Sequence, residues 1–164
     1  MIPTPKPKRI EKASSLPGRL KDKVKKVQPA KKKKKPRQRS IKRLKADAWK
    51  LMSIKIRNKY AIDGMVACYT CGAVAPIKEM QAGHGVAGRG NAVLFLEEII
   101  KPQCVACNVF NHGKYQVFVP KLIREIGQEV YEQIEKDSHK PVKRNREYYL
   151  NLIENLSMKL ERVK

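Results

Sequence analysis

The stretch that decides the fold runs from Cys68 to Asn108. It opens with Cys68-Tyr-Thr-Cys71 and closes with Cys104-Val-Ala-Cys107-Asn108, and these two pairs use every cysteine of the 164-residue chain. Two tight turns that each present two thiolates supply the four soft, tetrahedral ligands of a structural zinc ion. The spacing therefore predicts a structural Zn²⁺ site formed by all four cysteines.

Disulfides and redox dithiols are the alternatives to zinc. The first 45 residues are basic and contain no apolar run, so the sequence predicts no secretory signal and a cytoplasmic location. Paired cysteines in a reducing compartment favour metal over disulfide. A zinc ion with four cysteine ligands is fully coordinated, so any catalysis is expected to lie elsewhere.

The positive charge of the chain is concentrated near its N-terminus. Lys and Arg number 37 against 15 acids, and residues 1–45 hold 19 of the basic residues with only two acids. Several prolines and no apolar periodicity predict that residues 1–40 form a disordered, DNA-binding tail. A flexible polycation releases counterions from phosphates, so a nucleic acid is the expected partner. A solvated tail or an anionic membrane surface is the alternative, although no stretch approaches the ~20 apolar residues of a membrane span.

Residues 41–164 are predicted to form one α+β domain that binds zinc. The first expected elements are a helix over 41–60, a strand over 65–68 and a strand over 73–83. A loop with Gly83, Gly85, Gly88 and Gly90 follows, and residues 105–111 begin a helix. Two helices separated by Gly127, with Pro120 in a first turn, and a helix over 147–164 complete the domain. Leu152, Ile153, Leu156, Leu160 and Val163 give the last helix an apolar seam. The seam is expected to pack in the core or, alternatively, against a second subunit.

The residues between and beside the cysteine pairs carry a possible hydrolytic site. Phosphodiester hydrolysis needs a base that activates water and a divalent metal that balances charge on the leaving oxygen. His84, expected on a glycine-rich loop, is a candidate base, and Asn108 is a candidate metal ligand anchored beside a zinc cysteine. His112 would share a helix face with Asn108. The competing interpretation makes His84 an ordinary loop residue and Asn108 a helix cap.

A family resemblance adds to these residues. The runs Cys68-Tyr-Thr-Cys71, Met80-Gln-Ala-Gly-His84 and Gln103-Cys104-Val-Ala-Cys107-Asn108 resemble the phage recombination protein NinG family, also called Rap. The likeness spans roughly residues 41–164, and the chain is more distantly similar to phage endonuclease VII and HNH nucleases. The resemblance implies a small zinc-stabilised ββα-metal core, HNH-like or treble-clef, with flanking helices. It also implies a structure-selective endonuclease that cuts Holliday junctions and D-loops in phage recombination.

The same resemblance assigns roles to single residues. His84 matches the general base that opens the HNH motif, and Asn108 matches the metal-binding Asn after the last zinc cysteine. Many HNH enzymes carry an acidic metal ligand just before the histidine, where this chain has Gly83. The residues that could replace that ligand are Gln81, Glu79, Glu97 and Glu98.

Three functional hypotheses follow. The first is a metal-dependent DNA endonuclease with structural Zn²⁺, catalytic Mg²⁺ or Mn²⁺, and the catalytic residues His84, Asn108 and His112. Two symmetric cuts at a junction would need two sites, so a homodimer is expected. The second is a zinc-stabilised nucleic-acid-binding protein without catalysis. The third is an RNA-binding or ribosome-associated zinc ribbon.

Overall fold

The structure is a computed structural model that describes residues 38–88 and 90–161. The basic tail predicted over 1–40 lies almost entirely outside these residues, so its role in DNA binding stays a prediction. Within the described residues, no helix is both long enough and apolar enough to cross a membrane.

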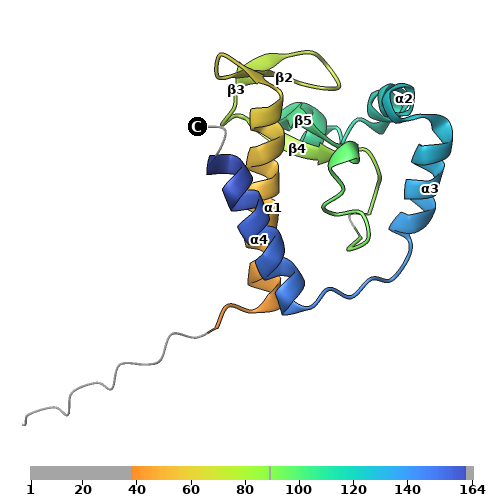
Figure 1. Cartoon of the computed structure of the whole chain (residues 1–164). Coiled ribbons are helices and arrows are strands. Elements are labelled where there is room, and N and C mark those ends of the chain that lie inside the picture. The colour runs from red at the N-terminus through yellow and green to blue at the C-terminus, as the bar shows by residue number, and fades with distance from the viewer. Residues whose placement is uncertain (1–37, 89, 162–164) are drawn as a thin grey trace, which may run out of the picture. The chain divides into compact units, whose positions relative to one another are not determined.

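The first element is helix α1 (Ile41–Lys59), which agrees with the helix predicted over 41–60. Ser40 caps it, because the serine hydroxyl accepts a hydrogen bond from the backbone N–H of Arg43. Apolar side chains at every fourth position are buried along one stripe: Leu44, Ala48, Met52 and Ile56. Leu44 and Ala48 belong to one buried cluster and Met52 and Ile56 to another, so α1, labelled in Figure 1, borders both clusters.

A three-stranded antiparallel sheet follows, in the order β1-β2-β3. Its strands are β1 (Ala61–Ile62), β2 (Met65–Ala67) and β3 (Val74–Pro76). The turn between β1 and β2 has positive φ at Asp63 and Gly64, as an Asp-Gly turn favours. The strand predicted over 65–68 is therefore confirmed as β2.

A second sheet pairs β4 (Met80–His84) with β5 (Ile100–Cys104) in antiparallel register, Gln81 opposite Gln103 and His84 opposite Ile100. The single strand predicted over 73–83 is wrong, because β3 and β4 belong to different sheets. Pro76 has no N–H with which to extend the ladder. A turn closed by the bond from Glu79 N to Pro76 O redirects the chain instead.

His84 was also expected on a glycine-rich loop, and the structure corrects that expectation. Gly83 and His84 are the last two residues of β4, and the His84 side chain is only 6% exposed. Gly85 suits close packing, since a β-carbon there would lie 2.4 Å from Leu122, whereas Gly88 lies in a turn with a φ of 90°.

Beyond β5 the chain is helical. A short wide helix, η2 (Ala106–Phe110), follows the second cysteine pair, and then come α2 (Tyr115–Ile126) and α3 (Gln128–Ser138). Gly127, with a φ of 88°, separates α2 from α3 as predicted. Pro120 lies in the second turn of α2 and not, as was predicted, in the first. Because proline has no N–H, the backbone carbonyl of Gln116, one turn earlier, receives no helical hydrogen bond. Gln116 is exposed.

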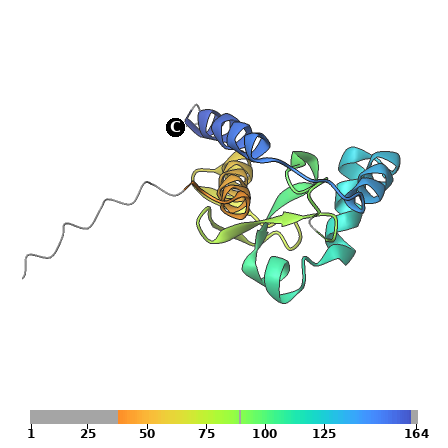
Figure 2. The same ribbon diagram turned by 90° about the horizontal axis from the view of Figure 1, so that it is seen from below.

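The last helix, α4 (Arg146–Glu161), lies alongside α1 in both views (Figures 1 and 2). Tyr149 of α4 packs with Leu44 and Ala48 of α1, and Leu152 and Ile153 lie against this cluster. The seam is thus packed within the chain, although its predicted member Val163 lies outside the described residues. The homodimer stays a prediction.

The main hydrophobic core lies where α1 crosses the β4–β5 pair and meets α2. Its completely buried members are Ile56, Ile99, Ile100, Phe118 and Leu122. The fold is α+β, as predicted. The η1 turn (Glu97–Ile99) leads directly into β5 and closes the segment that returns from β4.

Candidate metal centre and active site

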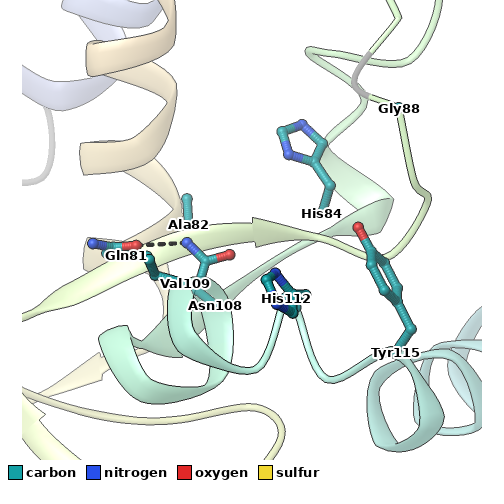
Figure 3. Close-up of a pocket in the computed structure, with 9 residues that line it drawn as sticks. Gln81, Ala82, His84, Gly88, Asn108, Val109, His112 and Tyr115 are labelled. Carbon is teal, nitrogen blue, oxygen red and sulfur yellow. Dashed lines mark hydrogen bonds between the residues drawn. The ribbon is translucent and has the colours of Figure 1, made fainter.

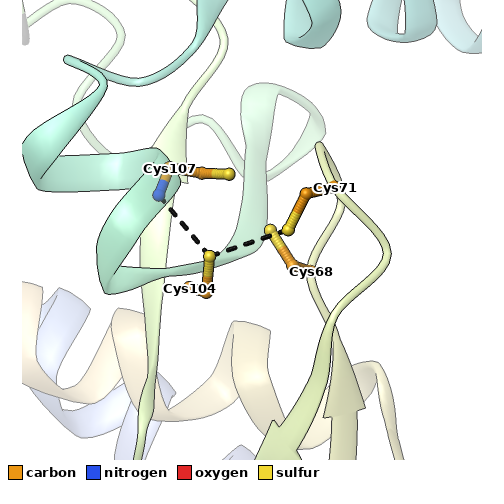
Figure 4. Close-up of side chains that lie close together, drawn as sticks. All are labelled: Cys68, Cys71, Cys104 and Cys107. Carbon is orange, nitrogen blue, oxygen red and sulfur yellow. Dashed lines mark hydrogen bonds between the residues drawn. The ribbon is translucent and has the colours of Figure 1, made fainter.

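The four cysteines form one cluster, drawn in Figure 4. Their sulfur atoms lie within 4.8 Å of one another, and Cys71 Sγ is 3.8 Å from Cys104 Sγ. All four are free thiols. Sulfurs on a tetrahedral zinc ion with bonds of about 2.3 Å are separated by about 3.8 Å. The cluster could therefore hold a zinc ion, whereas a disulfide would need the sulfurs at about 2 Å.

Two tight turns shape this cluster. After β2, Gly72 N donates to Cys68 O, and the left-handed φ of 77° at Gly72 closes the turn as predicted. After β5, the backbone N–H of Cys107 donates to Cys104 Sγ at 3.5 Å. A bond of this kind stabilises charge on sulfur, which is the form that binds metal.

The pKa values of Cys68 and Cys104 are shifted in opposite directions. Burial raises the pKa of Cys68, but hydrogen bonds from Thr70 and from neighbouring backbone groups outweigh it and lower that pKa to about 6. Burial, together with contacts from the other thiols, raises the pKa of Cys104 to about 12. Of these two thiols Cys68 loses its proton more readily, and a metal bound to Cys104 would have to displace the proton of that thiol.

A cavity of about 680 Å³ lies beside β4 and collects the predicted catalytic residues (Figure 3). Its lining includes His84 from β4, Asn108 from η2 and His112 from the turn before α2. In the described residues β4 pairs with β5 on one edge only. Because side chains from both sides of β4 border the cavity, it lies along the free edge of that strand.

His84 is held on two sides. Its ring stacks on the indole of Trp49 from α1, with centroids 4.7 Å apart and planes 22° from parallel. Its Nε2 is 3.0 Å from the backbone oxygen of Leu94. A carbonyl oxygen can only accept, so Nε2 carries the hydrogen, and in the neutral ring Nδ1 carries the lone pair that can take a proton.

Asn108 is held from the other side of β4. Its Nδ2 donates to Gln81 Oε1 at 2.6 Å, a bond that joins η2 to β4 and is drawn in Figure 3. The Asn108 oxygen then faces Gly83, where a β-carbon would lie 3.1 Å from it. Asn108 does not cap a helix, since it lies in the middle of η2.

His112 reaches the cavity by a different route from the predicted one. The helix η2 ends at Phe110, so His112 does not share a helix face with Asn108. Instead it opens a turn in which His112, Gly113 and Lys114 all have positive φ. Such a backbone costs energy at a non-glycine residue and persists only when its surroundings hold it.

Gln103 is the member of this region that sequence reasoning missed. It is completely buried, and its Nε2 donates to the backbone oxygen of Gly113 at 2.9 Å and to Thr70 Oγ1 at 3.3 Å. Thr70 Oγ1 in turn lies 3.2 Å from Cys68 Sγ. Gln103 therefore links the cysteine cluster to the strained turn that carries His112. A polar residue directly before Cys104, in a segment with apolar Ile100 and Pro102, was the available signal.

The absence of an acidic residue at position 83 has a steric explanation. A β-carbon at Gly83 would lie 1.9 Å from Gln103 Oε1, so no larger residue fits there without moving Gln103. Glu97 pairs with Lys55 and Lys59 of α1. Among the described residues no Asp or Glu lines the cavity, and of the proposed substitutes only Gln81 does.

The cavity continues into two smaller hollows along α1. The second hollow shares Gln81, Ala82 and Asn108 with the first, and Trp49 joins it to the third. These hollows add the basic side chains Arg57, Lys42 and Lys45 to the lining. The described part of this groove is thus cationic and polar, a surface that favours a phosphate backbone.

The chain was compared with known protein families, curated proteins and solved structures. The family model described as Bacteriophage Lambda NinG protein matches residues 6–164. No curated protein and no solved structure matches the chain.

Proposed function

Because this chain belongs to the bacteriophage lambda NinG protein family, we propose that it is a metal-dependent endonuclease that cuts branched DNA during phage recombination. The observation that carries the proposal is the cavity along β4. There His84, with Nε2 bonded to a carbonyl, borders the same space as the anchored amide of Asn108.

The proposed mechanism divides the work between two sides of the cavity. Nδ1 of His84 accepts a proton from the attacking water, while Trp49 and the Leu94 carbonyl keep the ring in one orientation. The amide oxygen of Asn108 suits a hard cation such as Mg²⁺ or Mn²⁺. A divalent cation bound there would stabilise the charge that develops on the leaving oxygen. His112 lies at the rim of the cavity, where it can contact the phosphate.

The order of the elements supports the proposed fold relationship. The segment from β4 through β5 to η2 runs strand, strand, helix, which is the order of a ββα-metal core. His84 ends the first strand, and Asn108 lies on the helix directly after the last cysteine. Zinc, in this proposal, fixes η2 against the strands and takes no part in hydrolysis.

The branched DNA substrate is proposed from the family to which the chain belongs and from the positive charge of its N-terminal residues. The basic residues 1–40 would contact the phosphates of junction arms and add affinity that falls with salt. Two symmetric incisions would be made by a homodimer, with one site per subunit.

Deleting residues 1–40 should weaken DNA binding and flatten its salt dependence without removing the junction preference. Loss of that preference would give the tail a larger role.

A second candidate function is a zinc-stabilised DNA-binding protein without catalysis. One observation favours it, namely that no carboxylate lines the described part of the cavity. Divalent cations usually bind at sites with at least one carboxylate. The groove and its cations would then bind the DNA backbone alone.

One experiment separates the two functions. A labelled four-way junction, a linear duplex and a single strand are incubated with zinc-loaded protein, with and without Mg²⁺, beside His84→Ala. Metal-dependent cutting of the junction should fall by about 10²-fold or more in the variant. His139→Ala is the matched control, because His139 is exposed at the end of α3. Binding without cutting in any divalent cation would establish the non-catalytic function instead.

A further inference from the structure

A second hollow, of about 320 Å³, adjoins the main cavity and is lined in part by α1. Trp49, Ser53 and Arg57 border it, and their spacing of four residues places all three on one face of that helix. The hollow and the main cavity share Gln81, Ala82 and Asn108. A ligand in the main cavity can therefore continue into this hollow, where the proposed mechanism gives Ser53 and Arg57 no role.

Arg57 is the charged member of this hollow, and its guanidinium is held by backbone carbonyls. Its Nε donates to Ser53 O at 3.0 Å, and its Nη1 donates to Ile77 O at 2.8 Å and to Met80 O at 3.2 Å. These bonds use Nε and both hydrogens of Nη1. The two hydrogens on Nη2 have no acceptor among the described residues.

The positive charge of Arg57 also lacks a counter-ion. Its three acceptors are neutral, and within residues 38–88 and 90–161 it forms no ion pair. Burial lowers the pKa of the Arg57 guanidinium from its usual value, and no carboxylate there reverses the shift. Because charged groups that are partly removed from water are normally paired, this arrangement favours a bound anion.

Two neutral donors border the same hollow. Gln81 Oε1 accepts from Asn108, and the nitrogen of the same amide points away from Asn108 in Figure 3. Ser53 adds a hydroxyl from α1. Among the described residues no Asp or Glu lines the hollow. A guanidinium, an amide NH₂ group and a hydroxyl without a carboxylate form a lining that suits phosphate oxygens.

We propose that this hollow binds a phosphate of the DNA strand that occupies the main cavity, with Arg57 Nη2 as the charged donor and with Gln81 and Ser53 as neutral donors. The inference rests on the proposed function only in taking DNA as the ligand, since phosphate binding here requires no hydrolysis. A phosphate held beside the main cavity fixes how the strand lies in it. Arg57 is therefore a positioning residue and not a catalytic one.

The test measures binding of a fluorescently labelled four-way junction to the full-length, zinc-loaded protein without Mg²⁺ or Mn²⁺. Fluorescence anisotropy gives the dissociation constant at several salt concentrations. Arg57→Ala removes the charged donor. Ser53→Glu keeps Arg57 and places a carboxylate four residues before it, where the carboxylate can pair with the guanidinium in place of a phosphate.

Ser157→Glu is the matched control. It makes the same charge change at a half-buried serine of α4, and Ser157 lines neither the main cavity nor the two hollows beside it. Thermal melting of every variant reports its stability, because Arg57 also ties α1 to the turn between β3 and β4. If Arg57→Ala does not fold, Ser53→Glu decides.

Arg57→Ala and Ser53→Glu should each bind the junction about 10-fold more weakly than wild type, as expected for loss of one charge-assisted contact. The slope of the logarithm of the affinity against the logarithm of the salt concentration should become shallower by about one. Ser157→Glu should stay within about twofold of wild type, because screening weakens a distant charge. A purely structural role of Arg57 would leave the salt slope unchanged.

Wild-type affinity and salt slope in a folded Ser53→Glu would overturn the site, and so would an equal loss in Ser157→Glu. Inorganic phosphate distinguishes a strand phosphate from a free anion. Micromolar phosphate should not raise the melting temperature of wild type, and a rise that Arg57→Ala abolishes would assign the hollow to a free anion instead.

These outcomes are separate from those of the proposed function. The binding test contains no catalytic cation, so its failure leaves the cleavage test standing. Conversely, junction binding that depends on Arg57 in a protein that cuts no DNA would establish the phosphate site and reject the nuclease.

Discussion

The two sides of β4 are built from different chemistry. On the side that faces α1, Ala82 lies in the hydrophobic core and His84 stacks on Trp49. On the side that faces η2, Gln81 and Gly83 meet the polar amide of Asn108. The first side is held by apolar and aromatic packing, and the second is held by hydrogen bonds next to the cysteine cluster.

This difference shows how a small fold can position two unlike groups. A general base needs a fixed ring and a defined tautomer, and packing against a helix supplies the first while a backbone carbonyl supplies the second. A cation ligand needs a fixed oxygen, and the hydrogen bond from Asn108 to Gln81 holds the Asn108 amide in place. Among the described residues the apolar cluster beside the cysteines is small, with Val66 and Met80 its only other buried members. That side should therefore depend on zinc for its stability.

The largest expected effect comes from breaking the η2 side alone. Cys107→Ser removes a buried thiol of the cluster, so zinc should be lost and the free energy of unfolding should fall by roughly 4 kcal/mol or more. Zinc content and thermal melting measure the change, and chelation of zinc from wild type should reproduce it. An unchanged melting transition would mean that the cluster has no structural role.

The second prediction concerns Gly83. Gly83→Asp restores the usual acidic residue, yet its β-carbon would collide with Gln103 Oε1. We expect a loss of about 1–3 kcal/mol in stability, because the new side chain overpacks this space. Denaturant unfolding provides the measurement.

A compensating change sharpens this second prediction. Gln103→Ala clears the space beside position 83, so the double variant Gly83→Asp/Gln103→Ala should be more stable than the sum of the single effects predicts. Additive effects would show that the two side chains do not compete for one space.

The third prediction tests the α1 side. Trp49→Leu removes the ring on which His84 stacks, and should cost about 1 kcal/mol beyond the lost buried area. Junction cutting should slow because His84 is less well oriented, while Mn²⁺ affinity stays unchanged. Trp49→Phe keeps an aromatic face and should recover most of the rate. A drop in Mn²⁺ affinity would contradict the separation of the two sides.

The smallest expected effect lies at Glu97, just beyond the segment whose Leu94 carbonyl orients His84. Burial raises the pKa of Glu97, but ion pairs with Lys55 and Lys59 outweigh it and hold that pKa below its ordinary value of 4.5. The ion pairs therefore stabilise the fold above that value, and their contribution disappears as the pH falls through the lower, folded-state pKa.

Glu97→Gln should accordingly cost about 0.5–1 kcal/mol near neutral pH, and the difference from wild type should shrink as the pH falls below 4.5. Urea unfolding across this pH range measures it. A difference that persists in acid would assign the effect to packing and not to charge.

The sequence predicted the features that local patterns encode. The spacing of the cysteines, the apolar period of 41–60 and the break at Gly127 each depend on a few neighbouring residues, and the structure has all three. The family resemblance selected His84 and Asn108, and the structure brings both to one cavity.

The features that were missed depend on contacts between distant segments. β5 contains Lys101, Pro102 and Gln103, so it shows no apolar alternation, and it is a strand because it pairs with β4. Trp49 and His84 lie 35 positions apart and meet only when α1 packs on the sheet. No local pattern reveals either contact.

The central claim is that His84 from one side of β4 and Asn108 from the other act in a single hydrolytic step. Single-turnover cutting of a four-way junction by wild type, His84→Ala, Asn108→Ala and the double variant tests it directly. Each single variant should lose about 100-fold or more in rate, and the double variant should lose no more than the worse single variant, because the two groups act as a unit. Independent, multiplying losses, or no cutting by wild type in Mg²⁺ or Mn²⁺, would contradict the claim.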